Sequence, residues 1–425
     1  MSMGHKQPTS SVSAAGPQAQ GQPFYQKLEQ ILTQYNFDPF VEQRCRRFYA
    51  RKRGRPSLAP GLYFRILLMG YFEGLGSERA MAWRLQDSLS LRAWLGFGPT
   101  DPVPVYKTLS NTRRRLSVRA HRHVFTFALA RLGEQGLLCG RTLGIDASTL
   151  QANAALKTLV RRDSGKTYAQ FLDGLLRALG IEAPTAEQRQ RLDRKRPKKL
   201  SNKDWVHRHD PQARITKLKD GRTRLGYKDE HVVDLDTGAV VAVQVHPGDR
   251  GDWQSLPGTL QQAQDNLLHI RQGAAAKDRS SRVEEVVGDK GYHSNQTLLE
   301  CKGGKLRTYF AEPQRGRRRW KGNKGAQQAV YQNRRRIRNR RGKQLLRRRG
   351  ELLERPFHHR LELGGMRRTH LRGQANVQKR EYLAASAQNL SLLMRHQYQL
   401  GTPRRLQDLR FPTPIPLPAP RRRAA

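Results

Sequence analysis

The first third of the chain shows the hydrophobic spacing of short helices. Residues 1–23 are rich in Gly, Ser, Gln and Pro and have no apolar period, which predicts a flexible tail. From there to about residue 138, apolar residues recur at three- and four-residue steps, as in helices that bury one face. The pattern therefore predicts a helical domain over residues 24–138.

One helix expected in this domain is short, polar and basic. It covers residues 105–116 and carries Lys107 and the run Arg113, Arg114 and Arg115. Such a helix resembles the recognition helix of a helix-turn-helix unit, which enters the major groove of DNA. A basic face that is only solvated would produce the same pattern. The sequence leaves both interpretations open.

From residue 139 the pattern changes to short apolar runs that alternate with helices. The runs predict strands at residues 142–146, 225–235, 239–245, 283–289 and 306–310. Helices are expected at residues 253–272, 294–300 and 383–396. Three strands in a meander, followed by α/β alternation, predict a mixed sheet with the layout of an RNase H-like fold over residues 139–400.

Three segments of the second domain depart from that alternation. Residues 150–222 are polar and irregular, so we expect a long insertion with one helix near residues 167–179. Residues 313–350 are strongly basic and contain no acid, which is typical of a disordered linker or of a segment that contacts phosphates. Residues 401–425 are rich in Pro and Arg and predict a disordered tail.

The net charge limits the classes of molecule that the protein is expected to bind. The chain of 425 residues has 80 Lys and Arg against 35 Asp and Glu, a formal net charge of +45. Nucleic acid, an anionic membrane surface or another polyanion would match it. No apolar run approaches the roughly 20 residues of a membrane helix, and no secretory signal is apparent.

The cysteines indicate the compartment. Cys45, Cys139 and Cys301 are odd in number and far apart, which excludes a disulfide framework and a cysteine-rich zinc ribbon. Ordinary free thiols fit a reducing cytoplasm.

Three carboxylates stand where catalytic groups are often found. Asp146 and Asp289 end apolar strands, and Glu354 follows the basic run. Because Pro356 is tolerated only in the first turn of a helix, we expect Glu354 near a helix N-terminus. Such a set could hold two Mg²⁺ ions for phosphodiester chemistry. Strands also end in Asp simply because Asp favours the turn that follows. The positions of these acids therefore do not decide between a metal site and ordinary turn residues.

Other polar candidates have simpler explanations. His207, His209 and Asp210 lack a zinc-like partner set and are expected on the surface. Asp252 is expected to cap a helix, although it could approach the site. Tyr292, close to Asp289, could orient a phosphate.

Local motifs carry a family resemblance. Residues 143–153, LGIDASTLQAN, resemble the first-aspartate motif of insertion-sequence DDE transposases, and residues 287–294, VGDKGYHS, resemble the second. Residues 353–357, LERPF, resemble the helix with the third acid. Residues 54–116 are similar to the N-terminal helical domain of that group. The resemblance spans about residues 25–396 and is closest to the insertion-sequence-eleven-eighty-two branch, whose members have a long insertion after the first strand.

The resemblance implies a function. A helical domain would bind transposon ends, and an RNase H-like domain would cut and join double-stranded DNA. Asp146, Asp289 and Glu354 would hold two Mg²⁺ ions, with Mn²⁺ as a substitute. Water would attack the phosphodiester at the transposon end, and the freed 3′-hydroxyl would attack target DNA without a covalent protein–DNA intermediate. We expect a homodimer or larger assembly on DNA, in the nucleoid.

Two alternatives stay open at this stage. One is an RNase H-like nuclease or resolvase that cuts without joining. The other is a transposase-derived DNA-binding protein with no catalysis.

The third motif departs from the wider family. A Tyr and an Arg normally precede the Glu and a Lys follows it, but Arg347, Gly350 and Leu361 occupy those positions. Neighbouring arginines could take over the phosphate contacts, and Glu351 competes with Glu354, which the spacing to Phe357 favours. The full set of expected DNA-contacting residues is Lys107, Arg113, Arg114, Arg115, Lys290, Arg348 and Arg349.

Overall fold

The N-terminal part of the chain is helical. The computed structural model describes residues 22–50, 57–196, 200–218, 220–273, 282–314, 316, 320–358, 360–361 and 364–403, so the expected tails lie almost wholly outside the described residues. The first helices are α1 (Pro23–Gln34), α2 (Phe37–Cys45), α3 (Pro60–Phe72), α4 (Glu78–Asp87), α5 (Leu89–Trp94), α6 (Tyr106–Arg115) and α7 (Val118–Glu134).

Side-chain caps set the beginnings of several of these helices. Ser77, Ser88 and Ser117 each accept a hydrogen bond from the backbone N–H three residues later, which satisfies a donor that the first turn leaves unpaired. The buried faces meet in one core that includes Phe24, Phe64 and Phe125.

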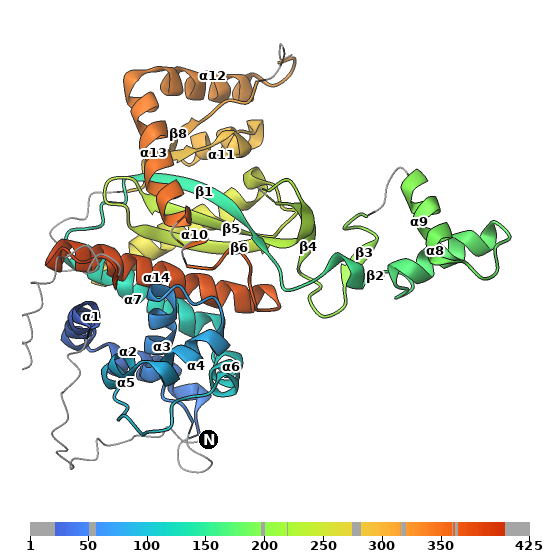
Figure 1. The fold of residues 1–425 in the computed structure, drawn as a ribbon. Helices are drawn as coiled ribbons and strands as arrows, with labels where there is room; N and C mark the ends of the chain where they lie inside the picture. Colours follow the sequence, from blue (N-terminus) through green and yellow to red (C-terminus); the bar gives the residue numbers. More distant parts are fainter. Residues whose placement is uncertain are drawn as a thin grey trace, which may run out of the picture.

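A mixed sheet forms the centre of the second part (Figure 1). Its strands are β1 (Thr142–Gln151), β4 (Arg214–Lys217), β5 (Thr223–Asp234), β6 (Val240–Pro247), β7 (Glu285–Gly288) and β8 (Arg307–Phe310). The order is β4-β5-β1-β7-β8, with β6 also paired to β5. β5 is antiparallel to β1 and β6, whereas β7 is parallel to β1 and β8. This topology confirms the RNase H-like fold class.

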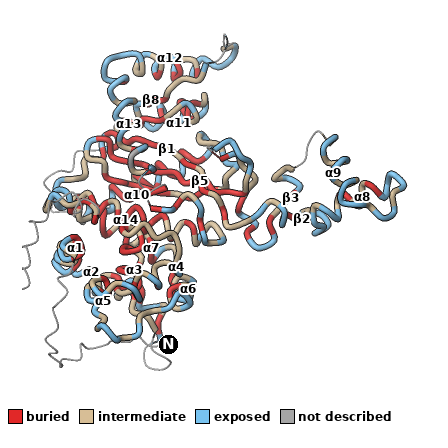
Figure 2. Tube along the Cα trace, in the orientation of Figure 1, coloured by how far each residue is buried: buried red, intermediate tan, exposed pale blue. Residues whose placement is uncertain are grey.

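Helices cover the sheet and join it to the N-terminal part. They are α10 (Asp252–Gly273), α11 (Asn295–Gly303), α12 (Lys324–Arg338), α13 (Arg340–His358) and α14 (Gln374–Tyr398). α10 packs on β5 and β6, α13 on β1 and β7, and α14 lies between β6 and α7. The strands are mostly buried while the outer faces of the helices are exposed (Figure 2). No helix in the described part of the chain has the length and apolar character needed to cross a membrane.

The insertion is more ordered than the sequence suggests. It contains the expected helix α8 (Tyr168–Ala178), and also α9 (Ala186–Lys195) and a two-stranded sheet of β2 (Leu159–Arg161) and β3 (Trp205–His207). Thr167 with Gln170, and Thr185 with Gln188, form capping boxes that start the two helices. In Figure 1 this part extends away from the sheet as an arm.

The basic segment is helical, so the expectation of a disordered linker is wrong where the structure describes it. α12 buries Ala326, Ala329, Val330 and Asn333, which lie on one face of the helix. Asn333 exchanges two hydrogen bonds with the Phe310 backbone of β8. The arginines of this segment also find partners elsewhere in the chain, and this offsets their mutual repulsion.

The expected position of Glu354 at a helix N-terminus is also wrong. Glu354 lies four residues before the end of α13, and Pro356 lies inside this helix near its C-terminal end. The sequence suggested that the basic run would precede this helix. In the structure, the part of the run from Arg340 onward forms the first turns of α13.

A cluster of buried charges joins β5 to α14 and to the chain after α13. The Arg360 guanidinium donates to Asp229 and lies 3.1 Å from a Glu381 carboxylate oxygen, and all three side chains are almost fully buried. His231 contacts the same guanidinium. Asp229, His231 and Glu381 are close enough to share a metal ion, but Arg360 already supplies the positive charge among them.

The charge of the cluster depends on the protonation state of Glu381, because the Arg360 guanidinium already pairs with Asp229 and the Arg380 guanidinium lies close by. Burial, and then the nearby Asp229, raise the pKa of Glu381 to about 7. Burial and Arg360 lower the pKa of His231, which keeps the ring neutral. Protonated Glu381 leaves the Asp229–Arg360 pair neutral, whereas ionisation adds a buried negative charge that the nearby Arg360 and Arg380 guanidinium groups offset only in part.

We expect Glu381→Gln to remove one component of the pH dependence of stability. Because the folded protein holds a proton on Glu381 that the unfolded chain has released, wild-type stability falls relative to the variant as pH rises between about pH 5 and pH 8, by up to about 3 kcal/mol. Denaturant unfolding of both proteins across this range measures the difference. His231 acts in the opposite direction in both proteins, so only the difference reports Glu381.

The control is Glu300→Gln, which changes an exposed acid in α11. A stability difference between wild type and Glu381→Gln that stays constant across the pH range would contradict the assignment of the buried proton.

Candidate active site

The sheet brings Asp146 and Asp289 to the same level of two neighbouring strands. Thr142 pairs with Glu285 and Gly144 with Val287 in the parallel ladder of β1 and β7. Continuing this register by two residues places Asp146 beside Asp289, which directly follows β7. Because side chains alternate along a strand, both residues point to the face that carries α13.

The turn after β7 holds Asp289 in place. Its carboxylate accepts a 2.8 Å hydrogen bond from the Gly291 N–H and caps the short helical turn Lys290–Tyr292. A Cβ atom at Gly291 would lie 2.0 Å from Asp252 Oδ2 and 3.1 Å from Asp289 Oδ1. A larger residue would displace the Asp252 carboxylate, because both carboxylates lie close to Gly291.

A cation from α13 already pairs with the first aspartate. Arg349 Nη2 lies 2.6 Å from Asp146 Oδ1, and both side chains are mostly buried. The Arg349 Nε–H also donates to the Ile145 carbonyl oxygen at 3.3 Å. Arg349 was expected to contact DNA, and the structure places it inside the candidate site instead.

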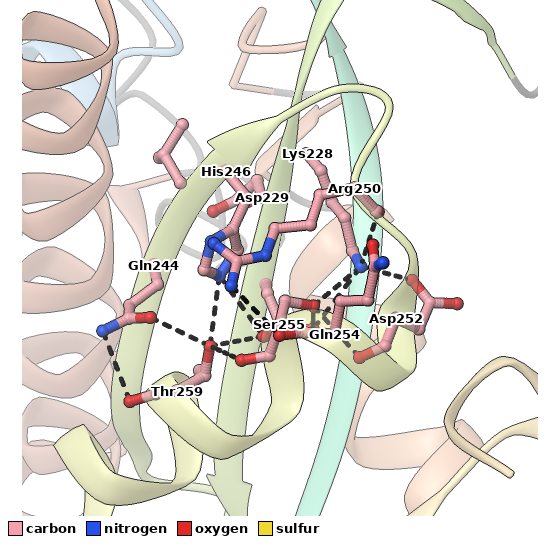
Figure 3. A network of polar contacts seen from close by, with 12 residues as sticks. Lys228, Asp229, Gln244, His246, Arg250, Asp252, Gln254, Ser255 and Thr259 are labelled. Atoms are coloured by element: carbon pink, nitrogen blue, oxygen red, sulfur yellow. Dashed lines mark hydrogen bonds and ion pairs between the residues drawn. The ribbon is translucent and has the colours of Figure 1, made fainter. Parts of the chain in front are cut away.

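Asp252, which the sequence presented as a helix cap, belongs to this neighbourhood. It is the first residue of α10 and lies 2.6 Å from the ammonium group of Lys228 on β5. Lys228 is almost fully buried, and its ammonium group also donates to Ser255 Oγ at 2.8 Å and to the Arg250 carbonyl oxygen at 3.3 Å (Figure 3). Sequence reasoning missed Lys228, because it begins a run of charged residues, Lys228 to His231, that gives no sign of being buried.

A buried network connects this lysine to the turn that holds Asp289. Glu230 lies 3.7 Å from the Lys228 ammonium group and accepts hydrogen bonds from Ser255 and from the Tyr292 hydroxyl, the latter at 2.9 Å. Burial raises the pKa of Tyr292 well above its ordinary value, so this hydroxyl keeps its proton and donates. Tyr292 is fully buried, so it supports the turn and does not face a phosphate.

The direction of the pKa shift of Glu230 shows that this network stabilises the charged form of the Glu230 carboxylate. Burial would raise the pKa, but hydrogen bonding to His246 and the charge of Lys228, together with two hydroxyl donors, lower it below its ordinary value. The carboxylate therefore stays ionised and holds α10 against β5.

Glu354 is not brought to the two aspartates. It is exposed, its Oε1 lies close to Gly350 of its own helix, and it lines a separate hollow with Glu351, Thr237 and Gly238. That hollow includes the β5–β6 turn, which adjoins the beginning of β1 because the Leu235 N–H donates to the Thr142 carbonyl.

Helix geometry explains the separation. Successive residues of an α-helix turn by about 100°, so Glu354 lies about 140° around the axis from Arg349. Since Arg349 faces Asp146, Glu354 faces away from it. Glu354 as the third catalytic acid stays a prediction.

The expected DNA-contacting residues of α6 fall into two groups. Lys107 and Arg114 are exposed and two turns apart, so they share one face with Asn111. Arg113 is turned inward, where its Nε–H donates to Glu78 at 2.7 Å. Arg115 lies over the ring of Tyr49.

The remaining expected contacts lie at the edges of the site. Lys290 is exposed beside Asp289, and Arg348 is exposed and donates to the Asp236 carbonyl oxygen at 3.0 Å. Both are accessible to a phosphate.

Comparisons with known proteins agree with the fold. The family model described as Transposase domain (DUF772) matches residues 17–115, and the model described as Transposase DDE domain matches residues 195–390. No curated protein matches the chain. The first match covers the N-terminal helices and the second covers most of the sheet, Asp289 and Glu354. The two matches lie in the order expected of a DDE transposase, and the chain belongs to the DDE transposases.

Proposed function

We propose that the protein binds the ends of a mobile DNA element and catalyses metal-dependent cleavage and strand transfer of double-stranded DNA. The observation that carries the proposal is the placement of Asp146 and Asp289 on one level of the sheet in a chain of net charge +45. The charge supplies affinity for phosphates, and the carboxylates supply the reaction site.

The residues present fit a site for divalent ions. Asp146, Asp289 and Asp252 provide hard oxygen donors of the kind that Mg²⁺ prefers. Asp289 and Asp252 lie at one turn, and Asp146 lies on the strand paired with β7. Two Mg²⁺ ions, or Mn²⁺ in their place, would stabilise the attacking and leaving oxygens of the phosphodiester. An ion on Asp146 would have to replace Arg349 as the partner of that carboxylate.

The protein's own residues orient the site. The Gly291 N–H holds the Asp289 carboxylate, and the buried network of Lys228, Glu230 and Tyr292 keeps the turn against α10. Arg349, once released from Asp146, and Lys290 are the nearest cations for the phosphate of the reacting strand. Glu354, which the family motif assigns as the third ligand, can approach only if α13 turns or shifts.

The first prediction concerns the two aspartates. Asp146→Asn and Asp289→Asn keep the side-chain shape but remove one negative charge, so cleavage and joining should each fall at least about a hundredfold, the equivalent of about 3 kcal/mol. Binding to transposon ends should persist, because it depends on the helical domain and the basic surface. Gel shifts measure binding, and strand transfer on a pre-nicked end in Mg²⁺ measures joining.

Either of two results would contradict this assignment. Normal joining by Asp289→Asn would exclude it as a ligand, and cleavage without joining by the wild-type protein would indicate a nuclease.

The second prediction identifies the third acid. Glu354→Gln should lose cleavage and joining as the aspartate variants do, whereas Glu351→Gln, a matched change on the same exposed stretch of α13, should retain both. Asp252→Asn is the competing variant. Loss of activity in Asp252→Asn with normal melting, together with an active Glu354→Gln, would move the third carboxylate to α10.

The third prediction separates the two groups of α6. Lys107→Gln and Arg114→Gln should each reduce the slope of log affinity for DNA against log salt by about 1, because each removes one phosphate contact. Arg113→Gln should instead lower the melting temperature, since it leaves Glu78 buried without its partner.

Binding titrations at increasing salt and thermal melts measure the two effects. The division fails if Arg113→Gln melts normally and loses as much affinity as Arg114→Gln.

A further inference from the structure

A second group of cations surrounds a hollow away from the candidate active site. The hollow has a volume of about 840 Å³ and lies where β1 ends and the insertion begins. Its lining contains two histidines, His207 and His209, and no Asp or Glu. The cations that line it are Lys157, Arg208, Arg222, Arg224, Arg368 and Arg372.

These cations have few internal partners. Within the described ranges, none of the six forms an ion pair, whereas arginines on α13 pair with Glu285 and Asp146. Arg224 Nε and His207 Nδ1 are buried in the wall without a hydrogen-bond partner. Asp210, the acid that adjoins His207, accepts hydrogen bonds from the Tyr227 hydroxyl and the Gly373 N–H. A buried donor without a partner is costly, so the wall favours an acceptor that comes from outside.

Three distant segments build the hollow and hold it together. The Gln151 N–H donates to the Arg367 carbonyl, and the Thr369 N–H donates to the Gln151 carbonyl, so residues 367–369 lie along the end of β1. The Ala152 N–H donates to the Leu225 carbonyl, which joins the start of β5 to the same place. Arg224 and Arg368 therefore stand on or beside paired backbone at the end of β1.

The position of the hollow relative to the aspartates is set by one strand. Gln151 lines the hollow, and Asp146 lies five residues earlier on β1. At about 3.3 Å per residue this distance is about 17 Å. Adjacent nucleotides in duplex DNA are about 3.4 Å apart along the axis, so the hollow lies about five nucleotides from the site.

We infer that this hollow binds the phosphodiester backbone of the DNA strand that reacts at Asp146 and Asp289, about five nucleotides from the scissile phosphate. The inference rests on the proposed function for its reference point, but the binding itself does not require catalysis. A groove lined by unpaired guanidinium groups and a lysine, with no acid, matches a chain of phosphates better than a single small anion.

Salt-dependent binding tests the charge contacts. The full-length double variant Arg222→Gln/Arg224→Gln is compared with wild type on a mixed-sequence duplex, in EDTA, at increasing KCl. We expect the slope of log affinity against log salt to fall by about 2. The matched control is Arg191→Gln/Arg194→Gln, which removes two exposed arginines from α9 in the same arm and should keep the wild-type slope.

Crosslinking and interference test the location. A photoreactive phenylalanine at Thr223, an exposed residue of the lining, should crosslink to the duplex, and one at the exposed Glu187 on α9 should not. Phosphate ethylation should weaken wild-type binding at positions about five nucleotides from the phosphate that Mg²⁺-dependent cleavage selects. The double variant should lose this interference.

The outcomes separate the two proposals. An unchanged slope in the double variant, or no crosslink from Thr223, overturns the inference whatever the catalytic result. A protein that does not cleave, but shows the reduced slope and the crosslink, retains the binding site and overturns the proposed function instead.

Discussion

Compensation of carboxylates by cations from distant segments is the interaction on which this structure depends. Glu285 on β7 is buried and paired with Arg341, Asp146 with Arg349, Asp252 with Lys228, and Asp229 with Arg360. A chain with 80 basic and 35 acidic residues has few acids to distribute, and the sheet uses several of them as attachment points. The basic helix α13 lies on β1 and β7 because its leucines pack against the sheet and two of its arginines reach acids there.

The same pairing gives the candidate site two charge states. With Arg349 on Asp146, the site is partly neutral and its two aspartates can lie side by side without strong repulsion. Removal of that guanidinium exposes the full negative charge to any cation that approaches. Lys228, in contrast, is buried among four polar partners, so it acts as a permanent part of the scaffold.

Strand and helix positions follow from local patterns, and the sequence predicts them well. The two apolar strands are predicted correctly and are parallel neighbours, and Asp289 directly follows β7 as expected. The expected strand end at Asp146 is wrong, because β1 continues to Gln151 and Asp146 lies in mid-strand. Hydrophobic spacing also predicts α10 and α14. The helical state of residues 324–358 was missed because the density of arginines hid the apolar positions of these helices, and because the acids and backbone groups of β7 and β8 that pair with them are distant in sequence. The inward orientation of Arg113 has the same cause, since Glu78 is distant in sequence.

The junction between the insertion and the sheet determines which changes in the length of the insertion the fold can tolerate. The arm leaves the sheet at Gln151 and the chain rejoins it through β4 and β5, and a backbone hydrogen bond from Ala152 to Leu225 joins the end of β1 to the start of β5. Chain added or removed beyond this junction alters neither the register of β1 nor the aspartate turn, and lengthening a loop costs little entropy once its ends are held together. Related chains could therefore acquire arms of different size and shape while keeping one reaction centre. The reach of such a protein along its substrate would then evolve separately from its chemistry.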